Sequence, residues 1–329
     1  MINTKQSWKV SGENEGVHSL DSEAQSFWAS SVNMGVFSGV GGVPIAYAWT
    51  IPANAHSAIV LLNGRVETFL KYKDVIFDLF NNGFAVFTLD HRGQGLSGRM
   101  TADTQQGYVE HFDDYVDDAL CFIQEHVIKY WHKPLSLMCH SMGGAIGTLA
   151  LLREPHLFQS AVLCSPMFGI RPALPNTLAN ILIRAGLKKS QLKNKSSDYF
   201  FGQGRYRVHP FKLNVLTHSK VRYQSILSLY AEQKHLRLGG VTSQWLAAAY
   251  QAMDTIENNA ERITCPMLVL SSGDDKVIDN KRQHRVVHQF QNAEYVVVDG
   301  AYHELLCESD SYRQYTLLKS MQFFTESFS

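Results

Sequence analysis

Short apolar runs and amphipathic stretches alternate along the chain from Ser57 onward. Runs rich in Val, Leu, Ile and Phe predict buried strands, and apolar residues spaced three and four apart predict helices. Alternation of this kind is typical of a mostly parallel central sheet with helices on both faces. The predicted strands are 57–62, 84–89, 135–139, 160–165, 266–271 and 294–298, and the predicted helices are about 69–82, 111–131, 143–153, 279–290 and 308–327.

Two segments depart from this alternation. Residues 43–49 alternate large and small side chains behind Gly41-Gly42, which predicts a β-hairpin. No strand pattern occurs between about 167 and 240, so we expect an inserted helical cap there. The predicted organisation is a polar lead-in at 1–27, an α/β domain formed by 28–166 and 240–329, and a basic cap at 167–239.

Bulk composition favours an enzyme without a cofactor. The 329 residues are 45% hydrophobic, and Lys plus Arg equal Asp plus Glu at 30 each, so overall charge gives no case for nucleic acid. The first 16 residues are polar and lack the apolar core of a signal peptide, which predicts a cytoplasmic protein. The five cysteines are scattered, and His284 and His288 lack a third ligand, so neither a metal nor another cofactor is expected.

Charge is strongly segregated. Residues 171–222 hold eleven Lys or Arg against one acid, Asp198, so this part of the cap carries +10 and the rest of the chain −10. A basic amphipathic helix suits the surface of an anionic membrane. The alternative is that its apolar side packs on the protein while its cations are solvated. The predicted apolar side is Leu174, Leu178, Ile181, Leu182 and Ala185, opposite Asn180, Arg184 and Lys188.

Ser141 is the candidate nucleophile. It lies between an apolar strand and a helix that begins with Gly143-Gly144, which is the context of a nucleophile elbow. Small neighbours leave room for the strained turn, and the helix N-terminus favours developing negative charge. Cys139 stands where the G-x-S-x-G pattern has its first glycine. The alternative is an ordinary helix-capping serine.

Two loops at strand ends complete this candidate site. Strand 57–62 leads into Asn63-Gly64-Arg65, so the backbone amides of Arg65 and Met142 are candidate oxyanion donors, although a plain Asn-Gly turn is an alternative. Strand 84–89 leads into a glycine-rich loop in which Asp90 and Arg92 are expected to hold the loop rather than to react.

An acid and a histidine follow Ser141 in the order that an elbow serine requires. Asp275 comes after strand 266–271, and His303 comes after strand 294–298. His303 would take the serine proton, and the acid would orient the imidazole. Asp275 is the preferred acid and Asp274 the second choice, while Asp299 is expected to brace the histidine loop.

With these residues assembled, the chain resembles the monoacylglycerol lipase and lysophospholipase group of α/β-hydrolases, in particular the bacterial membrane-associated lysophospholipases. The resemblance covers about 28–329 and implies an α/β-hydrolase fold with Ser141, Asp275 and His303 as the triad. Asn63 replaces the histidine that many members carry, and Cys139 replaces a glycine. The motifs that carry it are Asp90-His-Arg-Gly-Gln-Gly-Leu-Ser97, His140-Ser-Met-Gly-Gly144, Ser165-Pro-Met167, Ser272-Gly-Asp-Asp275 and Gly300-Ala-Tyr-His303.

The resemblance implies a serine hydrolase that cleaves the acyl ester of lysophospholipids and releases a fatty acid through an acyl-enzyme. Cap arginines such as Arg205 or Arg207 would lie near the headgroup phosphate, and the protein would be cytoplasmic and peripheral on the inner membrane. The alternatives are a monoacylglycerol lipase or broad carboxylesterase, a peptidase of related fold, and a catalytically silent lipid-binding member.

Overall fold

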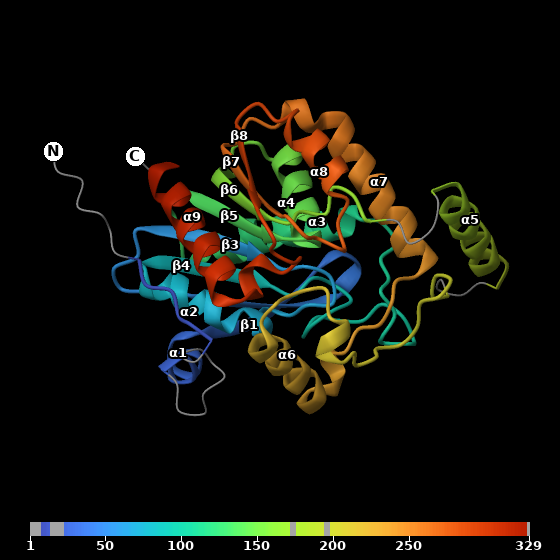
Figure 1. Cartoon of the computed structure of the whole chain (residues 1–329), viewed down its shortest axis with the longest axis horizontal. Coiled ribbons are helices and arrows are strands. Elements are labelled where there is room, and N and C mark those ends of the chain that lie inside the picture. Colours follow the sequence, from blue (N-terminus) through green and yellow to red (C-terminus); the bar gives the residue numbers. More distant parts are fainter. Residues whose placement is uncertain (1–7, 14–22, 172–175, 194–197, 328–329) are drawn as a thin grey trace.

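The computed structural model describes residues 8–13, 23–171, 176–193 and 198–327. Its centre is an eight-stranded sheet in the order β1-β2-β4-β3-β5-β6-β7-β8, which Figure 1 shows between two layers of helices. The five pairings from β4 to β8 are parallel, and β1 and β2 are antiparallel additions at one edge. The strands are β1 (Asn33–Ser38), β2 (Pro44–Thr50), β3 (Ser57–Leu62), β4 (Phe84–Leu89), β5 (Leu135–His140), β6 (Phe158–Cys164), β7 (Met267–Ser272) and β8 (Ala293–Val298).

Helices cover both faces of this sheet. The α-helices are α1 (Glu23–Ser31), α2 (Lys73–Asn81), α3 (Asp113–Cys121), α4 (Met142–Arg153), α5 (Asn176–Lys193), α6 (Lys220–Glu232), α7 (Ser243–Asn259), α8 (Asn280–Val287) and α9 (Asp310–Ser327). Short 3₁₀ turns lie at 40–42, 69–72, 127–129, 211–213, 234–236, 260–262 and 305–307, and a π turn lies at 122–126.

Alternate side chains of the buried strands pack into two separate hydrophobic cores, one on each face of the sheet. Val60 and Leu62 of β3 pack with α3, α4, α7 and α8 on one face, whereas Ile59 and Leu61 pack with α2 and α9 on the other. All six residues of β3 are buried because the strand is covered on both sides. The layers therefore hold the carboxyl ends of β3, β5, β7 and β8 rigidly at one edge of the sheet.

The predicted α/β alternation is confirmed, and each predicted strand matches an observed one to within two residues. The hairpin is also confirmed, since β1 and β2 pair in antiparallel register. Among the described residues outside the predicted cap, two α-helices were not predicted. α7 is capped by Thr242, whose side chain accepts from the Trp245 amide, and α1 begins inside the segment assigned to the lead-in, where it buries Ala24 and Phe27. The predicted helix 111–131 is interrupted by the π turn after Cys121.

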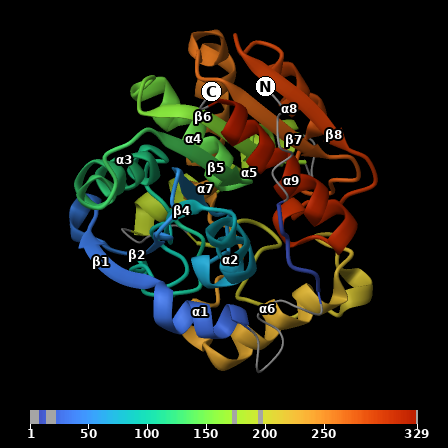
Figure 2. The ribbon, with the colours of Figure 1, turned by 90° about the vertical axis from the view of Figure 1, so that its left-hand side faces the viewer.

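No strand lies in the described part of 167–240, as expected for the cap. α5 lies at the rim of the molecule beside the end of α7, and α6 lies along another side next to α1 (Figures 1 and 2). Gly186 of α5 allows the close approach to α7, because a Cβ there would lie 2.1 Å from Ser243 Oγ.

The apolar side predicted for α5 is not the side that packs. Ala179 and Ile183 are buried, whereas Leu178 and Ile181 are 42% and 62% exposed, Ala185 is also exposed and Leu182 is half-buried. Leu174 lies outside the described residues. The alternative in which this side merely packs on the protein is therefore wrong for Leu178 and Ile181, because the helix meets α7 through a different stripe.

Candidate active site

Ser141 occupies the sharp turn between β5 and α4. Its φ of 51° and ψ of −115° lie in a region that non-glycine residues rarely adopt. Backbone bonds fix this turn: the Ser141 amide donates to Cys164 O at 3.1 Å, and the Met167 amide donates to Ser141 O at 2.9 Å. Its side chain makes no capping bond to α4. The helix-cap alternative is therefore wrong, and the hydroxyl is available for chemistry.

Small residues around the turn have specific packing reasons. A Cβ on Gly143 would lie 2.3 Å from Leu62 O, so only glycine lets α4 approach the end of β3 this closely. Cys139 is fully buried, and a Cβ on Gly147 would lie 2.7 Å from its sulfur. The glycine at 147 therefore provides the space that the side chain of Cys139 needs one turn below the elbow.

The structure brings Ser141, His303 and Asp275 into one hydrogen-bonded chain. His303 Nε2 lies 3.0 Å from Ser141 Oγ, and His303 Nδ1 lies 2.7 Å from Asp275 Oδ2. A carboxylate can only accept, so Nδ1 carries the proton and Nε2 faces the serine hydroxyl as an acceptor. This is the arrangement that lets an imidazole remove the proton of a serine during nucleophilic attack.

The environment of Asp275 keeps it ionised. Its second oxygen accepts from the amides of Val277 and Ile278 at 2.7 and 2.9 Å. Burial raises the pKa of Asp275, but His303 and these amides lower it more, so its pKa lies below the usual range. Asp274 is exposed, with Lys276 as its ion-pair partner at 3.8 Å. The geometry therefore favours Asp275 over Asp274.

The loop that carries His303 is held by two neighbouring side chains. Ser272 Oγ donates to Tyr302 O at 2.7 Å, and the Tyr302 amide donates to Glu308 Oε1 at 3.0 Å. Asp299, which we expected to brace this loop, is exposed. The position of the imidazole thus depends on the end of β7 and on the start of α9.

The loop after β3 presents the amide of Arg65 between two pinned neighbours. The Gly64 amide donates to Glu67 Oε2 at 2.5 Å, and the Val66 amide donates to Gln94 Oε1 at 3.2 Å. The hydrogen bonds of the described residues give the amides of Arg65 and Met142 no protein acceptor. Two free amides on the turns around an elbow serine can stabilise an oxyanion.

A buried ionic cluster behind this loop was not singled out from the sequence. Lys71 Nζ lies 2.5 Å from Glu67 Oε1 and 2.8 Å from Glu304 Oε1. Tyr72 donates to Glu67 at 2.6 Å. Burial raises the pKa of Glu67, but Lys71 and His140 outweigh it and lower the pKa to about 2. The polar residues of 63–72 directly follow a buried strand, but nothing in that segment points to the contact between Lys71 and Glu304.

His140, the residue before the elbow serine, also belongs to this region. Its ring centroid lies 4.9 Å from that of His303, and its Nε2 lies 3.5 Å from Glu67 Oε1. Burial lowers the pKa of His140 to about 3, so the ring is neutral at physiological pH. A neutral ring adds no positive charge beside His303.

Asp90 and Arg92 hold loops, as expected. Asp90 is fully buried and accepts from the Phe69 amide at 2.6 Å and from Thr68 Oγ1 at 2.8 Å. Arg92 forms a two-bond fork with Asp118 at 2.6 and 2.7 Å. Neither side chain is bonded to the Ser141–His303 pair, so both act through the loops that they fix.

The candidate substrate residues Arg205 and Arg207 lie on the cap surface. Both are exposed, and Arg205 Nε donates to Asp103 Oδ2 at 3.1 Å. The sequence placed them near the headgroup of a bound substrate, and no contact in the structure joins either one to Ser141 or His303.

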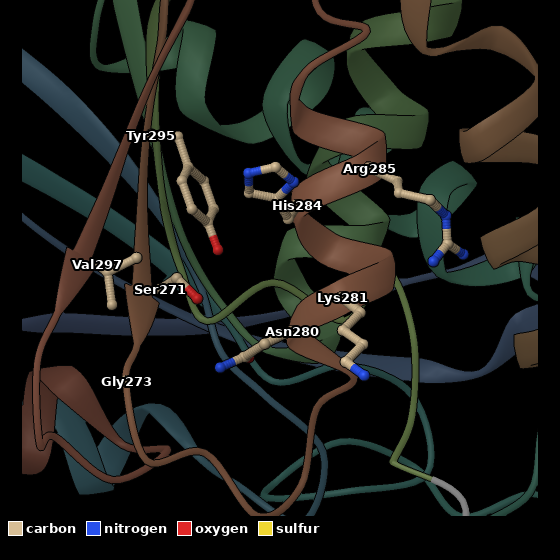
Figure 3. Close-up of a pocket in the computed structure, with 8 residues that line it drawn as sticks. All are labelled: Ser271, Gly273, Asn280, Lys281, His284, Arg285, Tyr295 and Val297. Atoms are coloured by element: carbon tan, nitrogen blue, oxygen red, sulfur yellow. The ribbon is translucent and has the colours of Figure 1, made fainter.

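Two surface cavities lie away from Ser141, which is itself only 8% exposed. One, of about 520 Å³, lies between α8 and the β7–β8 edge, and in Figure 3 Asn280 points toward Ser271 while Arg285 points away. The other, of about 550 Å³, lies beneath α6 and borders Lys71. Ser141 is thus largely buried in this conformation.

The family model of serine aminopeptidase, S33, matches residues 53–310, a range that includes the elbow and both loops that supply Asp275 and His303. The chain belongs to this family. Over 295 residues it is 35% identical to lysophospholipase L2 of Escherichia coli (strain K12), which covers 88% of this chain and 86% of that protein.

More distant matches are monoglyceride lipases. The chain is 27% identical over 259 residues to monoglyceride lipase of Rattus norvegicus, covering 78% of each. A soluble variant of monoglyceride lipase from Saccharomyces cerevisiae, solved with a substrate analog, superposes with a TM-score of 0.70 at 17% identity, covering 90% of this chain and 94% of that one. The expected α/β-hydrolase fold and the resemblance to the monoacylglycerol lipase and lysophospholipase group are confirmed.

Proposed function

We propose that this protein is a lysophospholipase in which Ser141 is the nucleophile, His303 the base and Asp275 the acid. The observation that carries the proposal is the hydrogen-bonded chain from Ser141 through His303 to Asp275 at 3.0 and 2.7 Å. The name of the Escherichia coli relative, at 35% identity, supports a single-chain phospholipid as the substrate.

The reaction follows from this geometry. His303 Nε2 takes the hydroxyl proton as Ser141 Oγ attacks the ester carbonyl, and the amides of Arg65 and Met142 receive the oxyanion. The imidazolium then protonates the departing glycerol oxygen, which leaves the acyl group on Ser141. A water that gives its proton to His303 releases the fatty acid and regenerates the serine. No step calls for a cofactor.

A monoacylglycerol lipase or broad carboxylesterase is the second candidate, because the same three side chains would serve it and the rat relative bears that name. An aminopeptidase is less well supported. It needs a carboxylate free to bind the substrate amine, whereas Asp275 is bonded to His303, and Glu67 and Glu304 are both paired with Lys71. The basic cap also disfavours a cationic substrate.

We further propose that the cap, at 167–239, docks the enzyme on an anionic membrane surface. Its exposed side chains combine charge with apolar area: Leu192 and Phe201 are 79% and 71% exposed, and Arg205 and Arg207 lie nearby in the sequence. Exposed apolar groups among cations suit the boundary between headgroups and acyl chains. No helix in the described part of the chain is long and apolar enough to cross a membrane.

The decisive experiment compares hydrolysis of lysophosphatidylcholine, lysophosphatidylethanolamine and monoolein by wild type and Ser141→Ala. We expect fatty acid release from the lysophospholipids by the wild type and loss of turnover in the variant. Equal or faster turnover of monoolein would favour the second candidate, and undiminished activity of Ser141→Ala would overturn the mechanism.

A catalytically silent lipid-binding member is the alternative from another class. A fluorophosphonate probe distinguishes it, because the probe labels only a serine activated by its base. Labelling of wild type but not of Ser141→Ala or His303→Ala supports an enzyme. An unlabelled wild type would support the silent alternative.

A further inference from the structure

The side chain of Arg65 extends from the candidate oxyanion loop to the last residue of the predicted cap. Its Nη1 donates to Gly239 O at 3.0 Å, and its guanidinium lies 5.6 Å from the centroid of the Trp245 ring. Gly107 borders the same space, since a Cβ there would lie 3.1 Å from Arg65 Nη1. The cation is therefore held between the loop after β4 and the segment that leads from the cap into α7.

In the described part of the chain, no carboxylate forms an ion pair with this guanidinium. Arg92 and Arg313, which are buried, have carboxylate partners in Asp118 and Asp78, whereas the half-buried Arg65 has none in the described residues. Burial lowers the pKa of Arg65 to about 10, so the side chain stays charged at neutral pH although it is poorly solvated. A cation in such a place gains free energy from any anion that reaches it.

The reach of Arg65 matches the dimensions of a lysophospholipid. In a 1-acyl lysophospholipid six bonds separate the ester carbonyl carbon from the phosphorus, and six bonds also separate the Arg65 amide nitrogen from its guanidinium carbon. Either path spans at most about 7 Å. An ester whose carbonyl oxygen lies at the Arg65 amide can thus bring its phosphate within reach of the guanidinium of the same residue.

We propose that Arg65 binds the groups at both ends of the glycerol unit. Its backbone amide donates to the carbonyl oxygen, and its guanidinium binds the phosphodiester of the lysophospholipid. This inference rests on the proposed function. A monoacylglycerol has an uncharged hydroxyl where the phosphate would be and forms no ion pair there, so Arg65 sets the preference for phospholipid. Arg205 and Arg207 are exposed on the cap and would meet headgroups of the surrounding membrane instead.

The test measures selectivity on short-chain substrates that stay monomeric, which separates the site from membrane binding. For each variant, kcat/KM for lysophosphatidylcholine is divided by kcat/KM for the matching monoacylglycerol, so that general damage to the oxyanion loop cancels. A hydrogen-bonded ion pair predicts that Arg65→Ala lowers this ratio roughly 10- to 100-fold, that Arg65→Lys lowers it less, and that the exposed Arg262→Ala leaves it unchanged.

A second measurement needs only the wild type. Glycerophosphocholine, which carries the same phosphodiester, should inhibit monoacylglycerol hydrolysis competitively, whereas glycerol at equal concentration should not. An unchanged ratio in Arg65→Ala, or no inhibition by glycerophosphocholine, would overturn the role of Arg65 while lysophospholipid turnover by the wild type still supports the proposed function. A wild type that hydrolyses the monoacylglycerol but no lysophospholipid would overturn both.

Discussion

Lys71 Nζ lies 2.8 Å from the carboxylate of Glu304, the residue that directly follows His303. The same ammonium binds Glu67, whose other oxygen receives the Gly64 amide. One buried cation therefore joins the loop that presents the candidate oxyanion donor to the loop that presents the candidate base. The two halves of the site are coupled through this ion pair as well as through the sheet.

Lys71→Met should destabilise the protein strongly, because it leaves the carboxylates of Glu67 and Glu304 buried without their partner. Breaking a buried pair from one side costs about 3–5 kcal/mol. The loss is measured as the difference in the free energy of unfolding in urea between wild type and Lys71→Met. Lys319→Met is the matched control, since its pair with Glu294 is partly exposed and should contribute at most about 1 kcal/mol. Equal losses in the two variants would argue against a buried cluster.

Glu67 should make the protein sensitive to acid. Its pKa in the folded protein, about 2, lies below the ordinary value of 4.5. The stabilisation is therefore fully present above about pH 4.5 and is lost as the pH falls toward 2. The difference in unfolding free energy between wild type and Glu67→Gln should shrink over this range. A difference that stays constant from pH 6 downward would contradict the linkage.

Asp275→Asn should lower kcat by about 10⁴-fold, since an amide that donates to His303 Nδ1 selects the wrong tautomer. The variant should remain folded, because the replacement has the same shape. Asp274→Asn is its control, as this neighbour is exposed and outside the hydrogen-bonded chain. Steady-state hydrolysis of a chromogenic ester by both variants and the wild type measures kcat. A larger loss in Asp274→Asn would exchange the roles of the two acids.

Gly143→Ala should reduce both stability and kcat. Alanine normally stabilises a helix relative to glycine by about 0.5–1 kcal/mol, but here its Cβ would lie 2.3 Å from Leu62 O and would push α4 away from the candidate oxyanion loop. Gly204→Ala provides the comparison, because a Cβ there meets nothing within 4 Å. Thermal unfolding and ester hydrolysis report the two effects, and a Gly143→Ala enzyme as active as wild type would exclude this packing constraint.

The parallel strands and the positions of Ser141, Asp275 and His303 at their ends could be predicted, because each residue follows a continuous apolar strand and parallel strands bring their carboxyl ends to one edge. The cluster of Glu67, Lys71 and Glu304 could not. Glu304 is far from Glu67 and Lys71 in the sequence, and all three are charged, so local pattern alone assigns them to solvent. Only the packing of the two loops shows that they are buried together.

The stripe of α5 that packs on the protein could not be predicted for a related reason. Helical spacing identified an apolar side that includes Leu178 and Ile181, which stays exposed, whereas the helix packs through Ala179, Ile183 and Gly186. Close contact with α7 requires a narrow stripe that includes glycine, and hydrophobic periodicity cannot distinguish a side that packs on protein from one left exposed.

The exposed side of α5 should take part in membrane binding. Ile181 and Leu192 are 62% and 79% exposed, and Arg184 and Lys188 lie on the same helix. Burial of one such side chain in lipid is worth about 1.5–3 kcal/mol, so Ile181→Asp and Leu192→Asp should each weaken binding to phosphatidylglycerol vesicles about tenfold or more. Ile128→Asp, at a residue 53% exposed outside the cap, should have no effect.

Co-sedimentation with the vesicles at low and high salt measures this binding. Binding of the wild type should weaken as the salt concentration rises, because the lysines of the cap contribute to it. Binding that ignores lipid charge and salt, or that Ile128→Asp reduces as much as Ile181→Asp, would exclude the cap as the docking surface.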